Sequence, residues 1–96
     1  MSCNESDLEA KVPGCIQQEI DEMTTCGEEA AVEEYLFQND TVFVFHMGNC
    51  PDAGSSVLDS ECNYLGLLGG IAALREINGV DFWENATLIR VVWEEE

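Results

Sequence analysis

Five cysteines in a chain of 96 residues constrain this protein more than any other feature of its sequence. Cys15, Cys26, Cys50 and Cys62 lie among regular hydrophobic patterns, and Cys3 lies near the start. The chain has no Cys-x-x-Cys motif for metal binding or redox exchange, and two disulfides plus one separate cysteine are typical of an oxidising compartment. The cysteine content therefore predicts a disulfide-stapled extracytoplasmic domain, with buried reduced cysteines as the alternative.

The length and hydrophobic content predict one folded domain. A chain of ninety-six residues is long enough for one domain but close to the lengths at which a single hydrophobic core gives only marginal stability. A hydrophobic fraction of 46% is ordinary for a globular chain. Residues 1–13 have little apolar periodicity and end near the helix-breaking pair Pro13-Gly14. We expect residues 1–13 to be an N-terminal tether and residues 14–96 to be a single domain.

The net charge of -17 excludes whole classes of partner. Nucleic acids and anionic membrane surfaces both require basic side chains, and this chain has only Lys11, Arg75 and Arg90. Three explanations of the charge remain: solubility in salty surroundings, which is the favoured one, a cationic partner, or a bound divalent cation.

The first residues suggest a membrane anchor. The chain contains no run of about 18 apolar residues that would span a bilayer, and no signal peptide. Ser2-Cys3 followed by a polar segment is nevertheless typical of a bacterial lipoprotein after removal of its signal sequence. We therefore expect Cys3 to be lipidated, with an unmodified thiol as the alternative.

Periodicity predicts an α+β fold. Ile16, Ile20 and Met23 form one stripe of an amphipathic helix over residues 15–26, with Gly27 suited to its C-terminal cap. Residues 31–38 and 41–47 are rich in β-branched and aromatic residues around a turn at Asn39-Asp40, and residues 87–93 predict a closing strand. We expect the helix to pack on a small antiparallel sheet. The expected core residues are Ile16, Ile20, Met23, Leu36, Phe43, Phe45, Leu65, Ile89, Val91 and Trp93.

Geometry restricts the pairing of the cysteines. Cys15 and Cys26 would lie about 16 Å apart at the two ends of the helix, and a disulfide requires Cα atoms within about 7 Å. The hairpin brings the residues after Cys26 close to those before Cys50. We therefore predict the disulfides Cys26–Cys50 and Cys15–Cys62.

Two candidate sites carry weak chemical signals. His46 is the only histidine, and its apolar strand favours a hydrogen-bonded structural residue over a catalytic base. Asp59, Glu61 and Asn63 alternate like the start of a calcium loop, but the required glycine and distant glutamate are missing. A solvated turn is the favoured interpretation of the second pattern, and no cofactor is predicted.

Seven segments of the chain form a recognisable pattern: Cys15-Ile16, Tyr35 to Gln38, Val42 to Cys50, Val57 to Asn63, Leu67 to Gly70, Ile77 to Phe82 and Trp93. Together they resemble a family of small uncharacterised lipoproteins and secreted proteins of Bacteroidota bacteria. The resemblance covers residues 15–93 and implies export, disulfides and lipidation at a cysteine like Cys3; it implies no catalytic residue.

The expected function is a non-enzymatic binding module at the cell envelope, in the periplasm or on the outer membrane of a Gram-negative bacterium. Its partner would be a protein or small ligand, a cationic one being one of the options that the charge leaves open, and the chain is expected to be monomeric. The alternative is a small hydrolase that uses His46 with nearby carboxylates.

Overall fold

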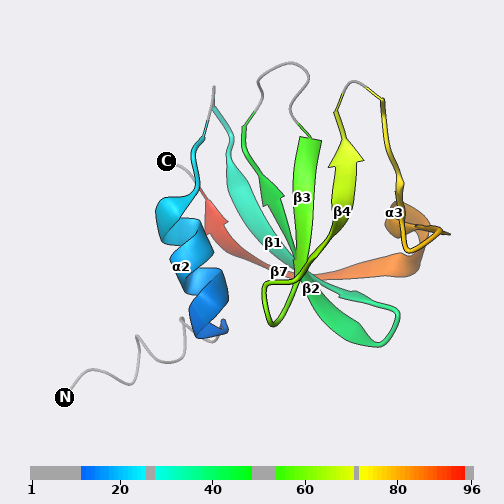
Figure 1. Ribbon diagram of the computed structural model, residues 1–96, viewed down its shortest axis with the longest axis horizontal. Helices are drawn as coiled ribbons and strands as arrows, with labels where there is room; N and C mark the ends of the chain where they lie inside the picture. Colours follow the sequence, from blue (N-terminus) through cyan, green and yellow to red (C-terminus); the bar gives the residue numbers. More distant parts are fainter. Residues whose placement is uncertain (1–11, 26–27, 49–53, 71, 95–96) are drawn as a thin grey trace.

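The protein is built around one five-stranded antiparallel sheet. The computed structural model describes residues 12–25, 28–48, 54–70 and 72–94. The strands of the sheet lie in the order β4-β3-β2-β1-β7, and β5 and β6 form a separate two-stranded ribbon (Figure 1). The elements are α2 (Gly14–Glu22), β1 (Ala31–Phe37), β2 (Asp40–His46), β3 (Gly54–Asp59), β4 (Tyr64–Gly69), β5 (Glu76–Ile77), β6 (Val80–Asp81), α3 (Phe82–Asn85) and β7 (Ala86–Glu94).

The hairpin of β1 and β2 forms as predicted, but its turn lies one residue earlier. Gln38 and Asn39 both have positive φ, 55° and 68°, which is the conformation of a two-residue hairpin turn with the twist that strands favour. Phe37 consequently pairs with Asp40, whereas the predicted turn at Asn39-Asp40 would have paired it with Val42. The partner of each residue differs by two positions from the one that the predicted turn gives, so the same side chains share each face of the hairpin in both registers.

The larger hydrophobic core lies on one face of the sheet, beneath the β5, β6 and α3 segment. Phe82 of α3 is fully buried and lies 5.1 Å from the Tyr35 ring and 4.9 Å from the Phe37 ring, measured between centroids. α3 begins at Phe82 because Asp81 caps it, accepting a hydrogen bond from the Glu84 backbone N–H at 2.9 Å. The buried members of this core are Tyr35, Phe37, Val42, Val44, Val57, Leu68, Ile77 and Phe82.

A smaller cluster lies on the opposite face, where α2 borders the sheet (Figure 1). Ile16 and Ile20 are the two buried residues of α2, and they join Val32, Phe43 and Phe45 in this cluster. The adjacent residues of β2 therefore point alternately into the two clusters, which explains why the sequence of β2 is apolar on both faces.

The predicted α+β architecture, with an amphipathic helix packed as a layer on a small sheet, is wrong. Just over half of the described residues lie in strands, and α2 is a single helix of nine residues beside a five-stranded sheet. The helix ends at Glu22, not at residue 26, because Met23 adopts an extended conformation with ψ 144°. Thr24 and Thr25 follow, and β-branched residues favour extended backbone over helix.

Of the ten predicted core residues, four are buried, three are half-buried and three are exposed. Ile16, Ile20, Phe43 and Phe45 are buried, and Met23, Leu65 and Trp93 are half-buried. Leu36, Ile89 and Val91 were predicted as core but are 45–49% exposed. For Ile89 and Val91 the reason is that β7 pairs only with β1 among the described strands, with register irregularities opposite Val32/Glu33 and Glu34/Tyr35. Leu36 lies near the end of β1, opposite Thr41 and Thr87, one residue before Phe37 and the hairpin turn.

Candidate functional site

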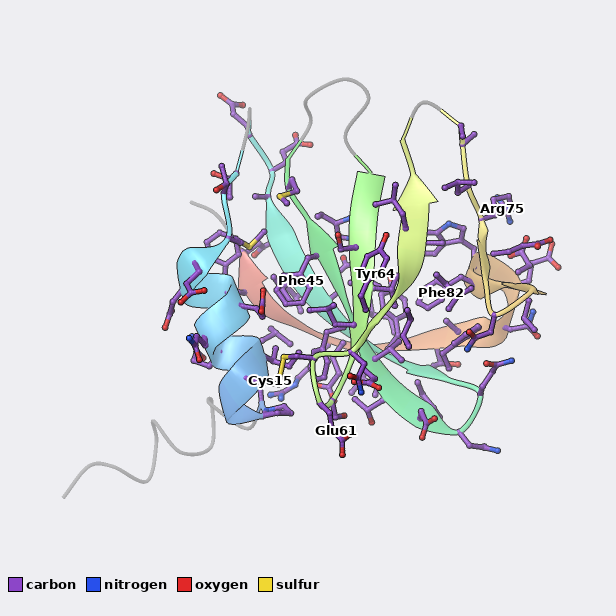
Figure 2. The ribbon with its side chains drawn as sticks, viewed as in Figure 1. Cys15, Phe45, Glu61, Tyr64, Arg75 and Phe82 are labelled. Carbon is purple, nitrogen blue, oxygen red and sulfur yellow. A yellow bond between two sulfur atoms is a disulfide. The ribbon has the colours of Figure 1, made fainter. Side chains whose placement is uncertain are left out.

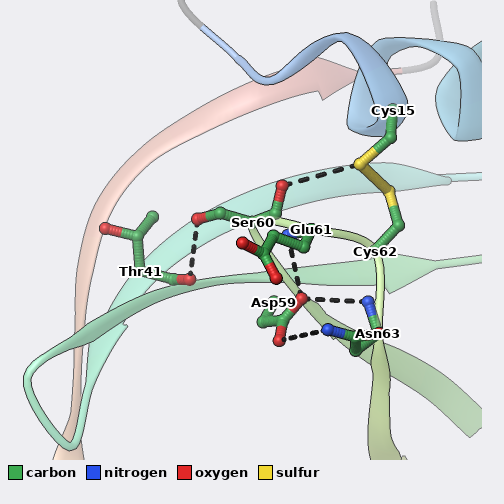
Figure 3. The surroundings of a disulfide bond; sticks show 7 residues. All are labelled: Cys15, Thr41, Asp59, Ser60, Glu61, Cys62 and Asn63. Carbon is green, nitrogen blue, oxygen red and sulfur yellow. Dashed lines mark hydrogen bonds between the residues drawn. A yellow bond between two sulfur atoms is a disulfide. The ribbon is translucent and has the colours of Figure 1, made fainter.

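A disulfide joins Cys15 at the start of α2 to Cys62 in the turn between β3 and β4 (Figure 3). The two Cα atoms are 6.2 Å apart and 47 positions apart in the sequence. This bond confirms the predicted Cys15–Cys62 pair. The predicted Cys26–Cys50 pair and the predicted lipidation of Cys3 fall outside the described residues. A disulfide of this kind indicates a non-reducing environment.

The turn that carries Cys62 is organised by Asp59. One carboxylate oxygen of Asp59 accepts hydrogen bonds from the backbone N–H groups of Glu61 and Asn63, each at 2.9 Å, and the other accepts from the Asn63 side-chain amide at 3.1 Å (Figure 3). The backbone hydrogen bond from Asn63 is the largest cause that lowers the pKa of Asp59. Both oxygens of this carboxylate therefore already have donors within the turn.

The three residues predicted as a weak calcium candidate, Asp59, Glu61 and Asn63, thus lie in one turn. Asn63 donates its amide N–H to Asp59, so these two residues already bond to each other. In the part of the chain that the structure describes, no three His, Cys, Asp or Glu side chains gather as a metal site would require. The turn has the arrangement of a hydrogen-bonded structural turn, and the favoured interpretation, a turn without bound calcium, stays a prediction.

His46 lies in a chain of hydrogen bonds that crosses three neighbouring strands. Its Nδ1 is 2.7 Å from Ser55 Oγ on β3, and its Nε2 is 2.9 Å from Glu33 Oε1 on β1. The Tyr35 hydroxyl donates to the same Glu33 oxygen at 2.9 Å. The His46 and Glu33 side chains are 28% and 23% exposed, so the chain is half-buried but reachable by solvent.

The connection of hydroxyl, imidazole and carboxylate has the order of a Ser-His-acid triad. It arises from pairing: His46 lies directly opposite Ser55 on β3 and opposite Ala31 on β1, two residues before Glu33. Burial, then the hydrogen bond to Glu33 and its charge, raises the pKa of Tyr35 to about 12. The sequence singled out His46 but missed Ser55 and Glu33, because only the strand pairing places them beside it.

The second candidate site is a groove between α2 and the sheet, on the face opposite His46. The groove encloses about 370 Å³. Its floor is apolar and includes Phe45, Leu58 and Tyr64, and Figure 2 labels Phe45 and Tyr64. The complete lining is Glu19, Glu22, Met23, Thr24, Phe45, Met47, Ser56, Leu58 and Tyr64.

Two carboxylates from α2 form the charged rim of this groove. Glu22 accepts a hydrogen bond from the Gln18 side-chain amide at 3.2 Å, whereas Glu19 has no hydrogen bond or ion pair to another described residue. Tyr64 is 62% exposed, the largest exposure among the big apolar side chains. The groove therefore offers an apolar surface, an exposed aromatic ring and negative charge together.

The described helices include none with the length and apolar character needed to cross a membrane. No curated protein and no solved structure matches the chain significantly. A family model does match, and it covers residues 18–95, which include every strand and the turn with Cys62. The chain therefore belongs to the family described as Domain of unknown function (DUF6970).

Proposed function

We propose that this protein is a non-enzymatic, extracytoplasmic binding module that holds a cationic, partly apolar segment of a partner in the groove between α2 and the sheet. The observation that carries the proposal is the composition of the groove: an apolar floor with an acidic rim in a chain of net charge -17. A lysine or arginine side chain matches this surface because its alkyl stem is apolar and its end is charged.

The chemistry of the groove favours a basic segment over a purely apolar one. The methylene groups of a bound side chain would lie on Phe45 and Leu58, and its cation would lie near Glu19. The Tyr64 ring would add an attraction for a cation placed over its face, about 0.5–1 kcal/mol at exposed sites. The net charge of the whole domain would steer such a partner toward the protein and repel acidic competitors.

A pair of synthetic peptides tests the proposal directly. A ten-residue peptide of alternating Lys and Leu should bind by calorimetry, and the same peptide with Glu for Lys should not. The double variant Glu19→Gln/Glu22→Gln should weaken binding about 2- to 30-fold, taking two surface ion pairs at about 0.2–1 kcal/mol each. Tyr64→Ala should weaken binding further.

The matched control is Glu76→Gln/Glu84→Gln, which removes the same charge from the segment on the opposite face of the sheet. If this control lowers affinity as much as the rim variant, net charge alone explains the binding and the groove is not the site. Binding should also fall as sodium chloride is raised, since salt screens charges at the surface.

A small hydrolase is the second candidate function, and one observation favours it. Ser55 Oγ lies 2.7 Å from His46 Nδ1, so the imidazole could take the hydroxyl proton while Ser55 adds to an ester carbonyl. Glu33 would stabilise the imidazolium through Nε2. The groove is preferred because it offers a shaped binding surface, whereas the triad is so far a hydrogen-bond arrangement alone.

A fluorophosphonate probe decides between these classes of function. We expect no covalent labelling of Ser55. We also expect the wild-type chain and His46→Ala to hydrolyse 4-nitrophenyl acetate at the same rate. Ser56→Ala is the control, because Ser56 is adjacent in the chain but lines the groove on the other face. Labelling of Ser55 that disappears in His46→Ala and persists in Ser56→Ala would establish the hydrolase.

Location at the outer membrane or in the periplasm, with a lipid on Cys3, is part of the same proposal. The Cys15–Cys62 disulfide supports a non-reducing compartment, and the resemblance to Bacteroidota lipoproteins supports the anchor. Mass spectrometry of the protein isolated from its own cell envelope would show diacylglycerol and acyl mass on Cys3. A free Cys3 thiol in that material would remove the anchor from the proposal.

A further inference from the structure

The exposed apolar side chains of this protein are concentrated on α3 and β7. Seven large apolar side chains of the described residues are exposed, and four of them lie between positions 83 and 91. They are Trp83, Leu88, Ile89 and Val91, with exposures of 41–49%. Contiguous exposed apolar surface commonly marks a place where another molecule binds.

β7 is also an edge of the described sheet. It has nine residues and pairs with β1 on one side, and no other strand of the described residues pairs with its outer backbone N–H and C=O groups, which makes them a template for another strand. Natural edges are commonly protected by lysine or proline, and β7 has neither. Its two bulges add twist, yet they leave the consecutive residues Leu88 and Ile89 both exposed.

The charges of β7 suit a second copy of the same strand. Arg90, its one basic residue, donates from Nε to Glu34 of the same chain at 2.6 Å, so the middle of the edge is locally neutral. Glu94, its one acidic residue, is the last residue of the strand. Antiparallel pairing places the two Glu94 side chains at opposite ends of the shared ladder, as far apart as the strand allows.

We infer that two copies of this chain pair antiparallel through their β7 edges and form one continuous ten-stranded sheet around a two-fold axis near Arg90. In that register Ile89 of each copy lies opposite Val91 of the other, and Leu88 lies opposite Val92. Such an interface is self-complementary, as a two-fold contact must be. It is independent of the groove, which lies between α2 and the β2-β3-β4 side of the sheet.

The net charge of -17 on each copy gives this association a distinctive dependence on salt. Long-range repulsion between copies opposes pairing at low ionic strength, and screening relieves it as the Debye length shortens from about 30 Å at 0.01 M to about 3 Å at 1 M. We therefore expect a monomer in dilute buffer and a dimer in strong salt. Binding of a cationic partner in the groove would show the opposite trend.

Sedimentation velocity of the intact protein tests the inference across a range of sodium chloride concentrations. The dimer should appear with rising salt, and both Ile89→Lys and Val91→Lys should abolish it. Each of these changes reduces the repulsive charge, so loss of the dimer can come only from blocking the edge. Leu74→Lys is the matched control, because Leu74 is 43% exposed, lies off β7 and gives the same change in charge; it should leave the dimer intact.

Two results would overturn the inference. One is a protein that stays monomeric at millimolar concentration in 1 M sodium chloride. The other is a dimer that both edge variants retain, or that Leu74→Lys removes. Circular dichroism of each variant confirms that the sheet is intact before the comparison is made.

Discussion

Removal of the Cys15–Cys62 disulfide is expected to release α2 before it unfolds the sheet. α2 is intrinsically weak: it has nine residues, its N-cap Pro13 makes no side-chain cap hydrogen bond, and its first and last turns lack the charges that complement the helix dipole. Isolated helices shorter than about 12–15 residues are marginal in water. The helix therefore depends on its docking to the rest of the domain.

The free energy by which the disulfide stabilises the domain follows from the length of the loop that the bond closes. Cross-linking residues 47 positions apart removes loop-closure entropy from the unfolded chain worth about 4 kcal/mol at 25 °C in the chain-entropy description. Burial of Ile16 and Ile20 contributes about 3–6 kcal/mol in total to the docking of the helix. The disulfide is thus comparable in size to the burial of these two side chains.

The assay compares the wild-type chain with Cys15→Ser/Cys62→Ser, not with a reduced sample, so that the other three cysteines are unchanged. In urea denaturation, the free energy of unfolding of the double variant should be lower by about 2–4 kcal/mol. In hydrogen exchange, the backbone amides of residues 16–22 should lose protection while those of β1 and β2 stay protected. Cys3→Ser is the control and should change neither measurement. If the double variant lost less than about 1 kcal/mol and kept α2 protected, the two isoleucines would suffice and the reasoning would be wrong.

Three further outcomes are expected. Alkaline titration followed by ultraviolet absorbance should show Tyr35 ionising near pH 12, with this component absent in Tyr35→Phe; because the folded pKa is raised, stability should decline from about pH 10 to about pH 12. Thermal melting in calcium chloride and in sodium chloride at matched ionic strength should give superimposable curves, since both Asp59 oxygens already accept hydrogen bonds, and a calcium-specific rise of several degrees would contradict this. Gly54→Ala should destabilise the domain by about 1–3 kcal/mol in urea, because the added Cβ would lie 2.8 Å from Leu67 Cγ and 2.9 Å from the Leu68 carbonyl oxygen; an unchanged midpoint would show that β4 can shift.

Local patterns predicted the local structure well. Residues 31–38 and 41–47 form the predicted hairpin as β1 and β2, and residues 87–93 lie in β7 as predicted. The alternation around Phe43 and Phe45 placed these residues correctly in a core. In each of these cases the signal lies in neighbouring residues, where backbone preference and side-chain period act directly.

Errors arose where long-range pairing decides. The chemistry of residues 87–93 predicts a strand but says nothing of its neighbour, and placement at an edge left Ile89 and Val91 exposed. The Glu33 and Ser55 contacts of His46 depend on β1 and β3 both flanking β2. Val42 and Val44 were not among the expected core residues, and they are buried because a segment about 35 residues later in the chain covers their face of the sheet.

Ionic strength separates the two binding surfaces because their charges differ in kind. The groove combines an apolar floor with Glu19 and Glu22, so its interaction with a basic segment weakens as salt screens the attraction. The β7 edge is locally neutral through the Arg90–Glu34 pair, so salt changes only the repulsion between whole domains and strengthens pairing. A single salt series, with peptide binding and sedimentation measured on the same samples, therefore tests each proposal against the other. If peptide binding also strengthened with salt, the role of Glu19 and Glu22 in the groove would have to be abandoned. If pairing instead weakened with salt, the locally neutral β7 edge would have to be abandoned.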